Sequence, residues 1–183
     1  MPSDSMHCLF DSRTIAARVS ELGAAIDHAY SRAQAPLVAV CVLKGAFVFF
    51  ADLIRQMQTP LELDFVRLAS YGQQTTRQEK VHFSKDIEVS VQGKHVLIVE
   101  DIVDTGHTLA YLKQVFQARR PSSIAVCSLI HKTGRREIDL PVDFYGFALD
   151  KGFVVGYGLD CAEAYRQLDA IYELTEPASA PRG

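Results

Sequence analysis

The first third of the chain alternates between amphipathic and wholly apolar segments. Residues 13–33 carry apolar side chains at helical spacing, which predicts an amphipathic helix with Asp11 or Ser12 as its cap. The run 37–43 is apolar throughout and rich in β-branched residues, as expected of a strand buried on both faces. Residues 46–57 then predict a second helix.

The rest of the chain continues this alternation up to a polar tail. The further predicted elements are strands at 61–68, 81–91, 95–100, 124–130, 142–148 and 153–157 and helices at 107–119 and 161–169. The polar segment 70–80 is expected to be a mobile loop, and the Pro-, Ala- and Ser-rich tail 176–183 to be disordered. Strands that alternate with helices indicate an α/β fold with a mostly parallel sheet, in which ligands bind beyond the carboxyl ends of the strands.

Length and composition favour one globular domain, residues 1–183. The net charge of −3 argues against a surface that coats nucleic acid. The cysteines form neither a C-x-x-C pair nor a zinc spacing, and their use fits a reducing cytosol. We see no signal peptide and no apolar run long enough to span a bilayer, so a membrane is not expected as a partner. Nucleic acid is not expected either, because of the net charge.

Residues 96–108 carry the most informative pattern. An apolar strand ends in Glu100 and Asp101, and Asp104 follows before Thr-Gly-His-Thr opens a helix. Such a turn directs backbone N–H groups, two hydroxyls and the helix dipole to one point, and Gly106 allows close approach of the backbone. We therefore interpret 104–108 as a cradle for a monophosphate.

The two acids at 100–101 repel a phosphate, and instead suit sugar hydroxyls or hydrated Mg²⁺. A ribose phosphate with magnesium satisfies all of these groups. In the competing interpretation Asp104 merely caps the helix and Glu100-Asp101 are an ordinary strand end, but two acids at a buried edge need a counter-charge. The chain has neither G-x-x-x-x-G-K-[ST] nor a complete G-x-G-x-x-G, which disfavours a P-loop NTPase and a Rossmann dinucleotide site.

With these residues in view, the chain resembles the type I phosphoribosyltransferases, and among them the hypoxanthine-guanine group, over about residues 37–172. The strand-and-turn segment 96–108 is similar to the family's signature for 5-phosphoribosyl 1-diphosphate (PRPP). The other similar motifs, in the family's order, are Leu43-Lys44-Gly45, Ser70-Tyr71-Gly72, Lys132, the segment from Phe153 to Asp160, and Arg166. The resemblance implies a mostly parallel central sheet flanked by helices, with a small hood and a flexible loop.

The resemblance also implies an activity, which is transfer of the phosphoribosyl group of PRPP to N9 of hypoxanthine or guanine in purine salvage. Asp104 would be the general base at purine N7. Glu100 and Asp101 would hold the ribose hydroxyls and one Mg²⁺, and Asp160 a second Mg²⁺. The 5-phosphate would bind to Asp104, Thr105, Gly106, His107 and Thr108.

Three further groups of residues receive roles from the resemblance. Lys44, Gly45 and Arg166 would bind diphosphate, and the peptide of Lys44 and Gly45 can be cis in the family. Lys132 would donate to the purine 6-oxygen, because a cation cannot accept from a 6-amino group. The base pocket would also contain Phe153, Val154 and Asp160. A lid at 70–85 would exclude water, with Ser70 and Tyr71 as its working residues.

Several of these residues also have an ordinary structural explanation that involves no function. Lys44 and Lys132 are each consistent with a surface lysine, Phe153 with a core aromatic, and Arg166 with an exposed arginine on a short helix. His131 is expected to be non-functional.

Two departures from the family's pattern concern the base pocket. Asp150-Lys151-Gly152 replaces a Pro-Asp-charged run, and Cys161 replaces an aromatic after Asp160. Rival functions are a xanthine- or orotate-preferring transferase, and a regulator of the same fold that binds nucleotide or RNA without turnover. The family resemblance alone suggests a homodimer or homotetramer in the cytoplasm.

Overall fold

The computed structural model describes residues 6–71 and 80–175. The expected disordered tail at 176–183, and most of the expected mobile loop at 70–80, lie outside these residues. In chain order the elements are β1 (Met6–Phe10), α1 (Ser12–Tyr30), β2 (Leu37–Leu43), α2 (Phe47–Gln56), β3 (Leu61–Tyr71), β4 (Lys80–Lys85), β5 (His95–Val103), α3 (His107–Ala118), β6 (Ser123–Lys132), β7 (Phe144–Leu149), β8 (Val154–Val155) and β9 (Ile171–Leu174). None of the helices in the described ranges is long and apolar enough to cross a membrane.

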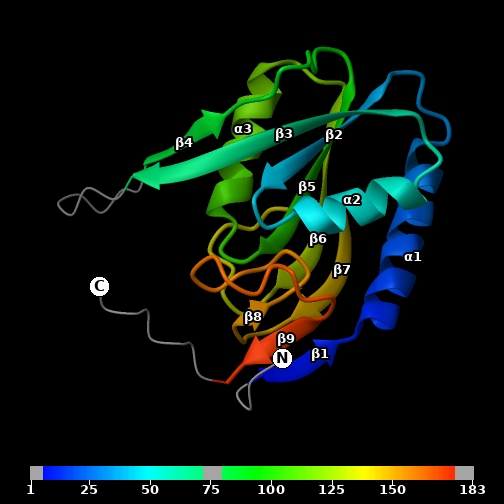
Figure 1. Cartoon of the computed structure of the whole chain (residues 1–183). Coiled ribbons are helices and arrows are strands. Elements are labelled where there is room, and N and C mark those ends of the chain that lie inside the picture. Colours follow the sequence, from blue (N-terminus) through cyan, green and yellow to red (C-terminus); the bar gives the residue numbers. More distant parts are fainter. Residues whose placement is uncertain (1–5, 72–79, 176–183) are drawn as a thin grey trace.

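Two sheets form the architecture. The central sheet has the order β4-β3-β2-β5-β6-β7, and all of its neighbouring strands are parallel except β3 and β4. The small sheet β1-β9-β8 is antiparallel and lies near the carboxyl ends of the central strands (Figure 1). The α/β fold with a mostly parallel sheet is therefore confirmed, and the small sheet together with the turns at 156–170, between β8 and β9, forms the expected hood.

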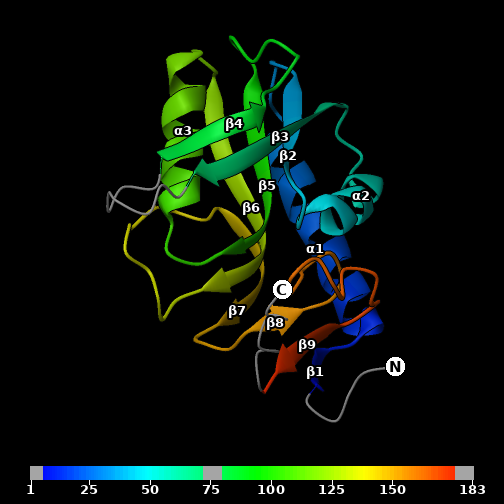
Figure 2. The same ribbon diagram turned by 60° about the vertical axis from the view of Figure 1, so that its left-hand side comes forward.

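The alternating side chains of the central strands divide the core in two. One set, with Ala39 and Leu97 among it, packs with α1 and α2 on one face of the sheet. The other set, with Val40 and Ile98 among it, packs with α3 on the opposite face. Figure 2 shows the helices on these two sides. Burial on both faces explains why β2, β5 and β6, in the middle of the sheet, have continuous apolar sequences rather than alternating ones.

Several predicted boundaries differ from the structure. β5 continues to Val103 and β6 to Lys132, because their ladder persists through the pairs Ile102–Ile130 and Val103–His131. The predicted strand ended at Glu100, whereas both acids at 100–101 lie inside β5. The terminal strands β1 and β9 were not predicted. They pair the two ends of the described chain, a contact that local patterns do not encode. Asp11 caps α1, since its Oδ1 accepts from the N–H of Thr14 at 2.7 Å.

The predicted helix at 161–169 is wrong. This segment forms turns in which Ala162, Glu163 and Tyr165 have φ values of +49°, +67° and +76°. Its backbone groups bond across the turn and to residues 157–158, instead of four residues along a helix. Tertiary pairing thus overrides the weak helical pattern.

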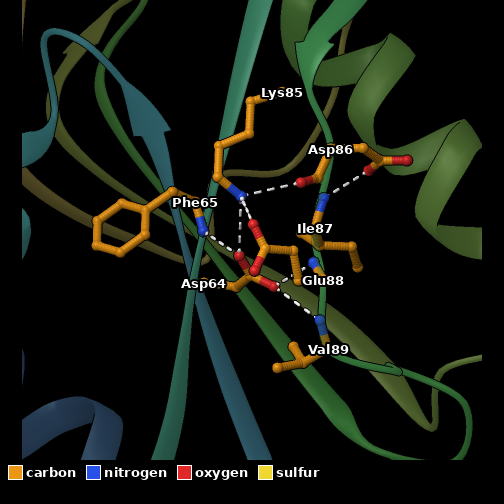
Figure 3. Close-up of polar contacts among 7 residues, drawn as sticks. All are labelled: Asp64, Phe65, Lys85, Asp86, Ile87, Glu88 and Val89. Atoms are coloured by element: carbon orange, nitrogen blue, oxygen red, sulfur yellow. Dashed lines mark hydrogen bonds and ion pairs between the residues drawn. The ribbon is translucent and has the colours of Figure 1, made fainter.

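A buried carboxylate holds the arm formed by β3 and β4 (Figure 3). Asp64 on β3 is 5% exposed. It accepts from the backbone N–H groups of Phe65 at 2.7 Å, Glu88 at 2.6 Å and Val89 at 2.9 Å. Lys85 Nζ lies 3.5 Å from Asp64 Oδ1. The N–H groups of residues 88–89 bond to Asp64 instead of to a neighbouring strand. The observed strand β4 therefore ends at Lys85, whereas the predicted strand continued to residue 91.

Candidate active site

The paired acids lie on β5, the strand between β2 and β6. Glu100 Oε2 is buried, and no group in the described part of the chain hydrogen-bonds to it. Burial raises the pKa of Glu100 well above its ordinary value, and the neighbouring Asp101 charge adds to this rise. Burial also raises the pKa of Asp101 to about 6, although the N–H of Ile102 and the Arg166 guanidinium oppose it. Both carboxylates are therefore in surroundings that favour a cation nearby.

The loop from Asp104 to Thr108 follows directly. Gly106 has a φ of +94°, a conformation that side-chain-bearing residues rarely adopt, and α3 begins after it without a side-chain cap. Asp104 therefore does not cap the helix, contrary to the bland alternative. The first turn of α3 leaves N–H groups pointing out of the helix, which together with the dipole form a site suited to an anion.

A second loop supports the first from behind. The N–H groups of Glu137 and Ile138 both donate to the carbonyl of Thr105 at 3.0 Å. The His107 Nε2 and Glu137 Oε2 atoms lie 2.8 Å apart at the exposed edge. A Cβ atom at Gly106 would lie 2.9 Å from the Ile138 carbonyl oxygen, so a larger residue would push the two loops apart.

Arg136 was not identified from the sequence. Its Nη1 would lie 3.3 Å from a Cβ at Gly106. Both terminal nitrogens of its guanidinium are buried, and no hydrogen-bond partner is found for them within the described ranges. A buried positive charge thus lies directly behind the phosphate-cradle loop. The available signal was positional, because Arg135-Arg136 closely follows the carboxyl end of a parallel strand.

Asp104 faces two cations from the same side. Its Oδ2 lies 3.5 Å from Arg135 Nη1 and 4.0 Å from Lys132 Nζ. The Lys132 side chain is only 7% exposed, which contradicts the surface-lysine alternative. Asp104 Oδ1 is buried and has no hydrogen-bond partner among the residues described. One carboxylate oxygen is therefore still able to accept a proton or a hydrogen bond.

The Lys44-Gly45 loop passes between the strand end and the hood. Its cis peptide joins Leu43 to Lys44, one position before the predicted bond. A Cβ at Gly45 would overlap the Asp101 carboxylate, and a Cβ at Gly158 would overlap the Gly45 carbonyl. Close contact on both sides explains the glycines and brings Lys44 to the same end of the sheet as the acids.

The hood supplies a corner of charged groups. Arg166 Nη2 lies 2.7 Å from Asp160 Oδ1, and Arg166 Nη1 donates to the Gly158 carbonyl at 2.8 Å. Lys44 Nζ lies 2.7 Å from Glu163 Oε2. The Arg166 side chain is 18% exposed, so the solvent-facing alternative for it is wrong. Glu163 was not identified from the sequence, because the segment was expected to be helical.

The remaining predicted site residues make fewer contacts with the residues described above. Phe153 is 43% exposed and directly precedes β8, so it is not a core aromatic. The described contacts connect it to the hood through its carbonyl and the N–H of Leu174, and not to Lys132. Val154 is buried and pairs with Glu173. Ser70 and Tyr71 end β3, and their side chains lie outside the description.

No three His, Cys, Asp or Glu side chains within residues 6–71 and 80–175 form a group that could hold a metal by itself. A magnesium ion bound by Glu100 and Asp101 would therefore need oxygen ligands from a substrate or from water, as Mg²⁺ commonly has in phosphate-handling sites.

Comparison with known proteins agrees with this arrangement. The phosphoribosyl transferase domain model matches residues 8–162. The hypoxanthine phosphoribosyltransferase of Salmonella typhimurium is 45% identical over 86% of this chain and 88% of its own length. For the hypoxanthine-guanine phosphoribosyltransferase of Bacillus subtilis the identity is 44%, over 93% of this chain and 94% of its own.

A crystal structure of a hypoxanthine-guanine phosphoribosyltransferase from Bacillus anthracis superposes with a TM-score of 0.84. It is 41% identical, and the match covers 91% of this chain and 97% of that one. Sequence, fold and the arrangement at the strand ends thus agree, and the chain belongs to the phosphoribosyltransferase family.

Proposed function

We propose that this enzyme transfers the 5-phosphoribosyl group of PRPP to N9 of hypoxanthine or guanine, giving IMP or GMP and diphosphate in purine salvage. The names of its relatives support this substrate class. The observation that carries the proposal is the position of Asp104, which begins the turn proposed to bind phosphate and whose Oδ2 lies 4.0 Å from Nζ of the buried Lys132. Its Oδ1 has no hydrogen-bond partner among the described residues. The reaction needs a site that binds the 5-phosphate, a group that accepts the purine proton, and a hydrogen-bond donor to the purine 6-oxygen.

Lys132 and Asp104 would recognise the base together. The Lys132 ammonium donates to the 6-oxygen of a 6-oxopurine but cannot accept from the amino group of adenine. Asp104 Oδ1 would accept the N7 proton as N9 forms its bond to the sugar. Phe153, being exposed, is available to stack on the base, while the backbone of Val154 would contact its edge and Asp160 would border it.

The phosphate end of the sugar would bind to the turn 105–108. Backbone N–H groups, the hydroxyls of Thr105 and Thr108 and the α3 dipole all favour an anion there. His107 would add its N–H, and the buried Arg136 guanidinium behind Gly106 would supply positive charge. Lys44, Gly45 and Arg166 would bind the diphosphate at the opposite end of the sugar.

Magnesium fits the donor set on this side. Glu100 and Asp101 would hold one ion with the ribose hydroxyls, and Asp160 a second. Glu100 Oε2 is buried without a hydrogen-bond partner in the part of the chain that the structure describes, and the pKa of both strand acids is raised; both observations support a cation at this place. Bound magnesium would offset the charge that develops on the departing diphosphate. The chain itself would hold the base, the sugar and the phosphate in line.

Bond breaking at the anomeric carbon would give it oxocarbenium character, so water must be kept away from it. Segment 70–85, with Ser70 and Tyr71, would close over the reactants as a lid. A cytoplasmic homodimer or homotetramer completes the proposal, on the basis of the family resemblance.

The test is nucleotide formation from PRPP and Mg²⁺ with hypoxanthine, guanine, xanthine or adenine. We expect hypoxanthine and guanine to be used far better than adenine. Adenine as the best substrate would refute the role of Lys132, a xanthine preference would favour the transferase alternative, and tight nucleotide binding without product would favour a regulator.

The Asp104→Asn variant tests the general base in the same assay. We expect kcat to fall about 10²- to 10⁴-fold, the usual contribution of a positioned base, with a much smaller change in PRPP binding. An unchanged kcat would remove the role of Asp104.

A further inference from the structure

The two cations expected to bind diphosphate already share an internal anion. Glu163 Oε2 lies 2.7 Å from Lys44 Nζ and 3.5 Å from Arg166 Nη2. The Glu163 side chain is 65% exposed, so it reaches this corner from the solvent side. A carboxylate and a phosphoryl group present the same kind of oxygen acceptor to these N–H donors.

The hood turn holds Glu163 at this corner. Its backbone N–H donates to Asp160 Oδ2 at 2.9 Å. Cys161 and Ala164 exchange N–H···O bonds of 3.2 and 3.0 Å across the turn. Glu163 itself has a φ of +67°, a conformation that non-glycine residues adopt rarely and that needs support from its surroundings. The turn therefore places the largely exposed carboxylate within reach of Lys44 and Arg166.

The Glu163 carboxylate already occupies donors that a diphosphate would use. Its Oε2 accepts a hydrogen bond from Lys44 Nζ at 2.7 Å. An ionised carboxylate and a diphosphate repel each other and compete for the same ammonium and guanidinium protons. Diphosphate can reach full pairing with Lys44 only when the Lys44–Glu163 pair opens.

We propose that Glu163 is a positioning residue that competes with diphosphate for Lys44 and Arg166, which weakens diphosphate binding and speeds its release. The inference rests on the proposed function, because it assumes that diphosphate binds at this corner. Lys44 and Arg166 would attract the diphosphate. Glu163 has the opposite role, because its ion pair with Lys44 forms again when the diphosphate leaves.

The Glu163→Gln variant tests the competition. The probe is magnesium diphosphate, titrated into the full-length protein by calorimetry at fixed ionic strength. Exposed ion pairs contribute modestly, so we expect the variant to bind the probe about two- to fivefold more tightly. The KM for PRPP should fall by a similar factor, and kcat should fall if diphosphate release limits turnover.

Glu21→Gln is the matched control. Glu21 pairs with Arg18 at 2.7 Å and is also 65% exposed, but it lies on α1 outside the charged corner. It should leave both diphosphate affinity and the KM for PRPP unchanged. Unchanged or weaker diphosphate binding by Glu163→Gln would overturn the inference, and weaker binding is the result expected if Glu163 helps to hold the metal instead.

A Lys44→Met background separates this inference from the proposed function. If the wild type binds magnesium diphosphate and Lys44→Met weakens it, the diphosphate corner is supported. The gain from Glu163→Gln should then shrink by more than half in Lys44→Met, and an undiminished gain would refute competition for Lys44. If the wild type binds no magnesium diphosphate, the proposed function fails, and the inference fails with it.

Discussion

Replacing Asp64 by Asn tests how the arm that leads to residues 72–79 is held. The carboxylate accepts from Phe65 through Oδ1 and from both Glu88 and Val89 through Oδ2. Asparagine keeps one acceptor oxygen and puts an NH₂ group in place of the other. At least one backbone N–H then faces a donor, and the attraction to the Lys85 ammonium is lost.

The size of the effect follows from burial. A hydrogen bond to a charged acceptor contributes about 1.5–3 kcal/mol, and an unsatisfied buried N–H costs about 1–3 kcal/mol. The asparagine oxygen should take the Oδ2 position, which accepts the two N–H groups of Glu88 and Val89, so that the N–H of Phe65 loses its acceptor. We therefore expect the free energy of unfolding to fall by about 2–4 kcal/mol. The Lys85 pair is partly exposed and adds little.

The pH dependence gives a second, independent signature. Burial alone would raise the pKa of Asp64, but the N–H groups of Val89, Phe65 and Glu88 lower it below its ordinary value. A depressed pKa gives stability that is present above the unfolded pKa of about 3.9 and is lost as pH falls through the folded pKa. The difference between wild type and Asp64→Asn should thus be full at pH 7 and shrink below about pH 4.

Urea unfolding at a series of pH values measures both quantities, with the exposed Asp139→Asn as control. The control should change stability by less than about 0.5 kcal/mol. A loss below that value for Asp64→Asn, or a loss that does not depend on pH, would refute the anchoring role.

Three further variants test the site. Lys132→Met should lower kcat/KM for hypoxanthine and guanine about 10- to 100-fold, the value of a buried charged hydrogen bond, and equal activity would contradict its role. Gly106→Ala must adopt a φ of +94° with its Cβ 2.9 Å from the Ile138 carbonyl oxygen, so the KM for PRPP should rise about tenfold. Arg136→Met should raise the KM for PRPP while leaving that for the base unchanged, and an effect on the base alone would refute the phosphate-side assignment.

The sequence predicted β2, β5 and β6 well, because a strand that is buried on both faces requires a continuous apolar run. It did not predict β1 and β9, since each is short and gains its stability by pairing with the other end of the chain. It also ended β5 at Glu100, because a strand was not expected to continue through two acids. The ladder with β6 outweighs the cost of those acids at the strand end.

The site was predicted where chemistry is carried by residues next to one another, as in Asp104 to Thr108. It was incomplete where distant segments meet. Arg136 reaches Gly106 only because the loop after β6 folds back on Thr105, and Glu163 reaches Lys44 only because the hood turn has positive φ values. The contact of Glu163 has no local sequence signal, and the signal for Arg136 was limited to its position after a parallel strand, so tertiary structure was needed to establish both contacts.

A crystal structure with Mg²⁺ and PRPP tests the central claim most directly. We predict that the 5-phosphate binds to the backbone N–H groups of residues 105–108, and that a magnesium ion lies beside the carboxylates of Glu100 and Asp101 and the ribose hydroxyls. Density for the phosphate or the metal at any other part of the chain would contradict it.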